Sequence, residues 1–209
     1  MTESGEERKV TKRQLEGEVN VEGSLELRLR TRLVLHWADI AMDQERLVRD
    51  GRAELERGHE AGDYRPKAEF HPALIAVAAC AHSLDALYGE FAQLVGPVEA
   101  SKRWAQIVGI LELAVERDIE PWRPRLETLF ADLRNPAVHP KAEAKEALPR
   151  PVFEANAPAE YAIYTVDTVR ESVDLLLEIL SACVEAPKPP VVTWANDTRA
   201  LVDSLQRRR

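Results

Sequence analysis

Residues 71–95 are apolar on nearly every side of a helix. Large apolar side chains alternate there with alanines, namely Leu74, Ile75, Val77, Leu84, Leu87, Tyr88, Phe91 and Leu94 with Ala73, Ala76, Ala78, Ala79, Ala81 and Ala86 between them. A helix without a polar face is stable when neighbours cover it on all sides, and alanines let those neighbours approach closely. The segment therefore predicts the central helix of a helical bundle.

A second long stripe of apolar residues precedes this segment. Ser24 is a good N-cap residue, and apolar side chains recur after it every three or four positions. The stripe consists of Leu25, Leu29, Leu33, Trp37, Ile40 and Leu47. It predicts a long helix from Ser24, with residues 62–66 as a firm stop. Because Leu25, Leu27 and Leu29 also alternate, a strand at the start of this stretch is the alternative.

Later stretches also show helical spacing, and the helices expected there cover residues 97–118, 121 to near 135, 165–184 and 194–206. The second of them must end near Asn135, because a proline disfavours helical geometry in the residue before it. Residues 137–164 hold four prolines and no helical period, and a connection of that length is usually functional or disordered. The sum is an all-α bundle of five or six helices.

Three parts are expected along the chain. Residues 1–23 have few large apolar side chains and mixed charges, which predicts a flexible arm. Residues 24–186 form the helical bundle, and residues 187–209 form a Pro-rich linker with a short C-terminal helix. No internal repeat and no second core are indicated.

The net charge of the chain argues against non-specific binding of nucleic acid. The chain carries 28 basic and 36 acidic residues, which gives a formal net charge of −8. An acidic protein is not expected to bind nucleic acid non-specifically. Residues 161–186 hold one base and five acids, whereas residues 187–209 hold five bases and two acids. The charge therefore favours a selective substrate, a low intrinsic affinity for nucleic acid, or an acidic face for a basic partner.

The sequence shows no sign of a membrane or secretory segment. The longest mostly apolar run without a charge, residues 72–81, is far shorter than the roughly 20 residues of a membrane-spanning helix. Residues 1–23 alternate acids and bases and lack the apolar core of a signal peptide. Cys80 and Cys183 lie among apolar neighbours, so two buried reduced thiols are expected. We therefore expect a cytoplasmic protein without contact to a membrane.

Signatures of common cofactor and metal enzymes are missing from the sequence. It contains no P-loop GxxxxGK(S/T), no dinucleotide-binding GxGxxG, no GxSxG elbow and no zinc-binding HExxH. The five histidines lie in different segments without metal-ligand spacing, and two cysteines are too few for a cysteine metal site. The sequence thus predicts neither a cofactor nor a metal.

One stretch stands out where an apolar-faced helix gives way to the irregular segment, and it reads LRNPAVHP over residues 133–140. An arginine also precedes other histidines at similar spacing, in the pairs Arg30–His36, Arg52–His59 and Arg65–His71. Of these arginines, only Arg134 is followed directly by an asparagine. The stretch resembles the signature of the HEPN family (higher eukaryotes and prokaryotes nucleotide-binding), an arginine, a small polar residue, three further residues and a histidine.

The resemblance implies a small α-helical bundle, and many HEPN domains are metal-independent endoribonucleases of toxin–antitoxin, abortive-infection and antiviral systems. The catalytic residues would be Arg134, Asn135 and His139. A histidine with a pKa of about 6.5 serves as acid or base near neutrality, and an arginine offers a planar fork to phosphate oxygens. RNA cleavage needs both an acid and a base, whereas one chain supplies one such histidine.

HEPN domains commonly dimerise so that two motifs face each other across a shared cleft. The resemblance therefore implies an RNA substrate and a homodimer, or a heterodimer with another HEPN-like chain. An antitoxin or another protein of a defence system would be a further partner.

Other interpretations stay open at this point. Arg134 can simply interact favourably with a helix dipole, Asn135 can be a C-cap, and His139 an ordinary loop histidine. His82 and Asp85, one helical turn apart, form either a polar network in the cleft or ordinary core contacts. The alternative function is a non-catalytic interaction module, HEPN-like or another helical type, that binds a partner protein.

Overall fold

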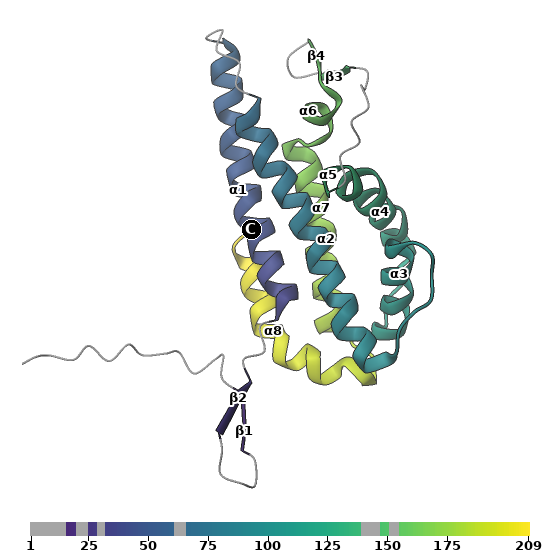
Figure 1. The fold of residues 1–209 in the computed structure, drawn as a ribbon. Helices are drawn as coiled ribbons and strands as arrows, with labels where there is room; N and C mark the ends of the chain where they lie inside the picture. The colour runs from purple at the N-terminus through teal and green to yellow at the C-terminus, as the bar shows by residue number, and fades with distance from the viewer. Residues whose placement is uncertain (1–15, 20–24, 29–31, 61–65, 139–146, 151–154) are drawn as a thin grey trace, which may run out of the picture. The chain divides into compact units, whose positions relative to one another are not determined.

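The structure of the protein, a computed structural model, describes residues 16–19, 25–28, 32–60, 66–138, 147–150 and 155–209. The chain falls into two compact units, Met1–Arg32 and Leu33–Arg209. The first unit holds a hairpin of two short antiparallel strands, β1 (Glu16–Val19) and β2 (Leu25–Arg28). The helices of the described residues all belong to the second unit (Figure 1).

The hairpin corrects the expected start of the first helix. The helix predicted from Ser24 begins instead at Leu33, and the alternative of a strand is confirmed at β2. Apolar and polar residues alternate along β2, which suits the two-residue period of a strand. The register puts Glu16 opposite Arg28 and Val19 opposite Leu25. The rest of the predicted arm lies outside the described residues.

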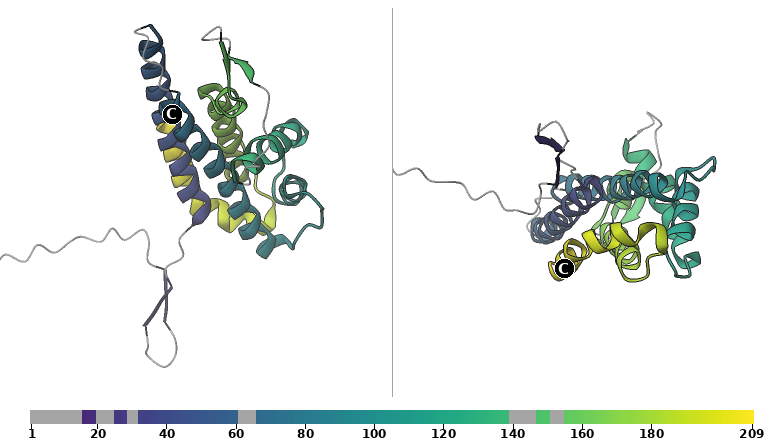
Figure 2. Two further views of the ribbon diagram at one scale, coloured as in Figure 1. Left: turned by 45° about the horizontal axis from the view of Figure 1, so that its top comes forward. Right: turned by 90° about the horizontal axis from the view of Figure 1, so that it is seen from below.

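The second unit is an all-α bundle, as predicted. Its central helix α2 (Lys67–Val95) packs against α1 (Leu33–Glu60), α3 (Arg103–Ala114) and α7 (Val166–Glu185). Figures 1 and 2 show α1 and α2 side by side along most of their length. The largest fully buried side chains are Leu55, Leu84, Leu87, Phe91, Ile107, Ile110, Leu111, Leu126, Leu129, Leu175, Leu176 and Ile179. The alanine-rich segment thus has the central place that its sequence predicts.

α2 is also long and apolar enough to cross a membrane by length and composition, the one helix among the described residues for which this holds. The apolar run of residues 72–81 is only one part of this helix. Half of the most apolar window of α2 is buried inside the bundle. Helices α1, α3 and α7 pack against α2, and the core helix of a bundle passes the same test of length and composition.

Both cysteines are buried and free, as predicted. Cys80 lies in α2 and Cys183 in α7. Burial raises the pKa of both thiols, so neither is a reactive thiolate at neutral pH.

A continuous helical run leads to the predicted motif. It consists of the 3₁₀ turn η1 (Glu120–Trp122), α4 (Arg123–Glu127), the π-helical segment η2 (Thr128–Arg134) and α5 (Asn135–Val138). The run was predicted to end near Asn135, and it continues to Val138. The N–H of Asn135 donates to the carbonyl of Phe130, five residues back. This wider turn accommodates the ring of Pro136, which in an α-helix clashes with the carbonyl four residues earlier.

The segment predicted to be irregular, residues 137–164, contains further regular structure. Strands β3 (Leu148–Arg150) and β4 (Ala155–Ala157) pair antiparallel, and α6 (Ala159–Ile163) follows them. Residues 139–146 and 151–154 lie outside the described residues. The prediction of irregular structure is therefore wrong for β3, β4 and α6.

The C-terminal part of the chain belongs to the same compact unit as the other helices. The 3₁₀ turn η4 (Pro189–Val191) leads into α8 (Val192–Arg207), close to the helix predicted at 194–206. Figure 2 shows α8 in yellow alongside α1, and α8 buries Trp194, Val202 and Leu205. The helix thus contributes to the core of the bundle.

Candidate active site

Arg134 and Asn135 lie where η2 joins α5. The side chain of Arg134 is 23% exposed, and its Nη1 donates a hydrogen bond of 3.2 Å to Oδ1 of Asn135. Asn135 itself is exposed. The structure therefore brings the first two residues of the motif together. His139, the third, lies outside the described residues.

Asp85 of α2 lies beside the guanidinium of Arg134. Its Oδ2 is 3.8 Å from Nη2 of Arg134, which is an ion pair longer than a hydrogen bond. The sequence offered His82 as a polar neighbour of Asp85, but the ring of His82 packs against that of Trp37, with centroids 5.0 Å apart. Among the described residues, the partners of Asp85 are arginines.

Arg103, the first residue of α3, is the closer partner of Asp85. Its Nε donates a hydrogen bond of 2.6 Å to Oδ1, and its Nη2 donates one of 3.2 Å to the main-chain carbonyl of Asp85. The third nitrogen, Nη1, donates to Oε1 of Gln106 at 3.0 Å. The guanidinium also lies over the ring of Tyr88, 4.1 Å from its centroid. All three nitrogens of Arg103 are thus occupied, and the group is held in one orientation.

Sequence reasoning did not find Arg103. It follows a seven-residue connection after α2, residues 96–102, and no local pattern distinguishes it from the other arginines of the chain. The packing of α3 against α2 brings it to Asp85, eighteen positions away in sequence. Its role is a tertiary contact between two helices, which spacing within one segment does not reveal.

The cluster of Asp85, Arg103 and Arg134 carries an excess of positive charge, because one carboxylate lies between two guanidinium groups. The Nε of Arg134 is buried and has no hydrogen-bond partner among the described residues. A buried N–H without a partner is costly, so an acceptor such as a water or an anion is favoured beside it. The guanidinium of Arg134 therefore has hydrogen-bonding capacity that the described residues do not use.

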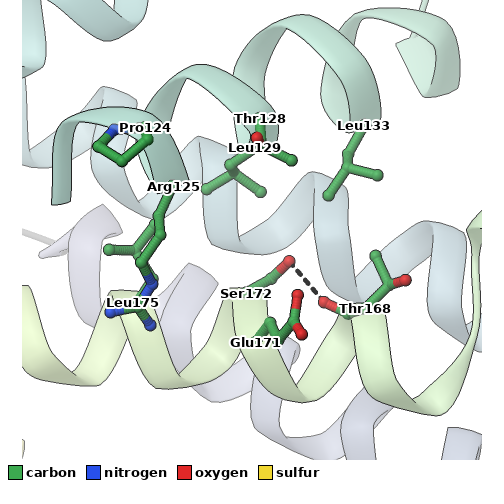
Figure 3. Close-up of a pocket in the computed structure, with 9 residues that line it drawn as sticks. All are labelled: Pro124, Arg125, Thr128, Leu129, Leu133, Thr168, Glu171, Ser172 and Leu175. Atoms are coloured by element: carbon green, nitrogen blue, oxygen red, sulfur yellow. Dashed lines mark hydrogen bonds between the residues drawn. The ribbon is translucent and has the colours of Figure 1, made fainter. Parts of the chain in front are cut away.

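A separate groove lies between the helical run of residues 123–133 and α7 (Figure 3). Its volume is about 450 Å³, and its lining comprises Pro124, Arg125, Thr128, Leu129, Leu133, Thr168, Glu171, Ser172 and Leu175. Figure 3 shows the hydroxyl of Ser172 turned to the carbonyl of Thr168, to which it donates at 2.8 Å. Neither Arg134 nor Asn135 lines this groove. It is therefore distinct from the candidate active site.

The acids of α7 do not form an open acidic face. Glu178 pairs with Arg125 at 2.6 Å, and Glu185 pairs with Arg117 at 2.5 Å. Asp174 pairs with Arg209. The excess of acids that the sequence places at 161–186 is thus largely matched by arginines from other segments.

No group of three or more His, Cys, Asp or Glu side chains lies together as a metal site within the part of the chain that the structure describes. The side chains around Arg134 suit an anion and offer no cluster of metal ligands there. No family model matches the chain, and neither a curated protein nor a solved structure does.

Proposed function

We propose that the protein is a HEPN-like, metal-independent endoribonuclease of the toxin or antiviral-defence type. The observation that carries the proposal is the state of Arg134, the last residue of η2, which has a buried N–H that lacks a partner among the described residues. Asn135 follows it directly, and His139 comes four positions after Asn135, with three residues between them. The all-α bundle is the fold class that the HEPN resemblance implies.

The chemistry of RNA cleavage assigns a role to each residue. A histidine takes the proton of a 2′-hydroxyl, whose oxygen then attacks the neighbouring phosphorus. The bond from phosphorus to the 5′-oxygen breaks, and an acid gives that oxygen a proton, which leaves a 2′,3′-cyclic phosphate and a 5′-hydroxyl. Arg134 donates to the phosphate oxygens as negative charge builds up on them. Asn135 orients Arg134 through the hydrogen bond to Nη1.

The base and the acid come from two copies of His139 in this proposal. A homodimer brings two motifs to one cleft, and a heterodimer with another HEPN-like chain would serve the same chemistry. The net charge of −8 opposes general capture of RNA, so the substrate is a selected RNA. We place the protein in the cytoplasm, with an antitoxin or a defence-system protein as a further partner.

Cleavage of RNA in excess chelator tests the proposal. Wild-type protein is expected to cleave single-stranded RNA under these conditions, to leave 2′,3′-cyclic phosphate ends and to spare DNA of the same sequence. The variant His139→Ala should lose the activity while its circular dichroism stays that of wild type. His36→Ala is the matched control, because His36 also follows an arginine at similar spacing but is an exposed residue of α1. Undiminished cleavage by His139→Ala contradicts the assignment.

One observation favours the alternative of a non-catalytic interaction module. Leu47 of α1 is 45% exposed and Ile75 of α2 is 47% exposed, so two neighbouring helices present large apolar side chains to solvent. Under this alternative purified protein leaves RNA intact, and a partner protein binds in stoichiometric amount. Sedimentation of the purified chain adds a second criterion, since the ribonuclease proposal expects a mass of two chains.

A further inference from the structure

Asp85 is shared unequally between two arginines. Its Oδ1 accepts a hydrogen bond of 2.6 Å from Nε of Arg103, whereas its Oδ2 is 3.8 Å from Nη2 of Arg134. Coulomb attraction grows as the distance shortens, and a direct hydrogen bond adds to it, so most of the charge of Asp85 is matched by Arg103. The positive charge of Arg134 is therefore only weakly compensated by Asp85.

Arg103 holds the carboxylate of Asp85 in one orientation. Its side chain is 37% exposed, and the contacts to Asp85, Gln106 and the ring of Tyr88 fix its orientation. Asp85 accepts from it twice, once through the carboxylate and once through the main-chain carbonyl. Asp85 is therefore not free to turn fully toward Arg134.

We propose that Arg103 and Asp85 are positioning residues that keep Arg134 available for a phosphate of RNA. In this arrangement Arg103 is the counter-ion of Asp85, which prevents Asp85 from becoming the counter-ion of Arg134. Asp85 still attracts the guanidinium across 3.8 Å, a distance too long for a hydrogen bond, so it does not take up an N–H of Arg134. The assignment rests on the proposed function, because it names the phosphodiester as the anion that Arg134 receives.

If Arg103 and Asp85 position Arg134, then removing Arg103 should block phosphate binding, whereas a merely structural role of Arg103 predicts no such block. Without Arg103, Asp85 has Arg134 as its remaining partner in the cluster, and the two form a direct ion pair that excludes phosphate. When Asp85 is also changed to asparagine in the Arg103→Ala protein, Arg134 has no carboxylate to pair with and can bind phosphate again. Arg103→Ala should therefore lose phosphate binding, and Asp85→Asn together with Arg103→Ala should regain it.

A binding assay with RNA that cannot be cleaved separates this proposal from the proposed function. The probe is a mixed-sequence pool of single-stranded 2′-O-methyl RNA with a fluorescent label, because a methylated 2′-oxygen has no proton to lose and cannot attack. Anisotropy is measured for wild type, Arg134→Ala, Arg103→Ala, Arg103→Lys, and the Arg103→Ala/Asp85→Asn double variant. Thermal unfolding of each variant is recorded beside it.

We expect Arg134→Ala and Arg103→Ala each to weaken binding about tenfold, which corresponds to about 1.4 kcal/mol. The double variant should recover most of that loss, and Arg103→Lys, which keeps a cation beside Asp85, should bind more tightly than Arg103→Ala. Arg117→Ala is the matched control, since Arg117 is also an arginine paired with a carboxylate, that of Glu185 at 2.5 Å, but lies outside the cluster. It should bind within about twofold of wild type.

Two results overturn the proposal. The first is equal binding by wild type and Arg134→Ala, or no binding by either, because Arg134 is then not a phosphate ligand. The second is a double variant that binds no better than Arg103→Ala. If the binding pattern is as expected but unmodified RNA is not cleaved, the proposed function fails and the positioning role stands.

Discussion

The hydroxyl of Tyr164 donates a hydrogen bond of 2.7 Å to the main-chain carbonyl of Leu133, the residue before Arg134. The π-helical turn and the proline that follows it interrupt the regular ladder of the helix at this point. Tyr164 is buried, and its ring centroid lies 5.9 Å from that of Phe70 in α2. A side chain next to α7 thus fixes the backbone from which the candidate active-site arginine projects.

The variant Tyr164→Phe should be less stable than wild type by about 1–3 kcal/mol, because a buried carbonyl loses its partner while the ring packing is kept. Burial raises the pKa of Tyr164 to about 12, against about 10 in the unfolded chain. The unfolded chain therefore loses this proton first as the pH rises, so the contribution of Tyr164 is complete below pH about 10 and is lost toward pH about 12.

Urea unfolding of wild type and Tyr164→Phe at a series of alkaline pH values checks both effects. The difference in free energy of unfolding between the two proteins should shrink as the pH rises. Tyr161→Phe is the control, since its ring also packs on Phe70 at 4.7 Å but its hydroxyl makes no hydrogen bond within the described residues. A difference that is constant with pH contradicts the raised pKa.

Gly51 allows α1 and α2 to approach closely. A Cβ at this position would lie 2.2 Å from the carbonyl oxygen of Ala68, which is backbone and cannot turn away. Gly51→Ala should therefore destabilise the protein by about 2 kcal/mol or more, since overpacking forces the helices apart. Thermal or urea unfolding measures the change.

Gly89 is the matched control for this prediction. It lies in α2, and a Cβ there would meet no atom within 4 Å. Gly89→Ala should stabilise the protein by about 0.5–1 kcal/mol, because alanine is the better helix former. Opposite signs for the two glycines are expected, and a loss of equal size at both would show that Gly51 has no special contact.

Much of the bundle follows from the sequence, because burial imposes a periodic pattern on each long helix. Residues 71–95 are predicted as the central helix and form most of α2. The pattern was less decisive over residues 25–28, where the same leucines fit a helix and a strand, and the pairing with β1 decides for the strand.

The candidate site is less visible in the sequence. Arg134 and Asn135 can be found in the sequence because the motif is local. They are adjacent residues, and Asn135 accepts a hydrogen bond from Arg134. The sequence pairs Asp85 with His82, one helical turn away, and no local pattern indicates its contact with Arg103. Contacts between helices depend on how the helices cross, and single-segment periodicity contains no information on that crossing. The placement of His139 in the site stays a prediction.

Arg209 bridges α1 and α7 through Glu45 and Asp174. The side chain of Glu45 is only 5% exposed, and its ion pair with Arg209 measures 3.8 Å. Arg209→Ala leaves a buried carboxylate without its partner, so it should lower the free energy of unfolding by about 2 kcal/mol or more. Arg207→Ala is the control, because Arg207 is exposed and should change the stability by less than about 0.5 kcal/mol. Equal stability of the two variants would rule out a structural role for Arg209.

Glu69 is a buried carboxylate at the junction of three helices. It is fully buried at 0% exposure, pairs with Nη1 of Arg52 in α1 at 3.3 Å, and accepts a hydrogen bond of 2.9 Å from the N–H of Val166 at the start of α7. Glu69→Ala removes the acceptor of that N–H and the buried partner of Arg52 together. We expect a loss of about 3–5 kcal/mol in the free energy of unfolding.

Glu56 provides the comparison, because it pairs with the same arginine at 2.8 Å but is 52% exposed. Solvent screens an exposed pair, so Glu56→Ala should cost at most about 1 kcal/mol. Urea unfolding of both variants decides between burial and pairing as the source of stability. If pairing with Arg52 alone mattered, Glu56→Ala would lose at least as much stability as Glu69→Ala, because the Glu56 pair is the shorter one. A much larger loss at Glu69 shows that the stability comes from the buried pair with Arg52 and from the hydrogen bond to the N–H of Val166 at the start of α7.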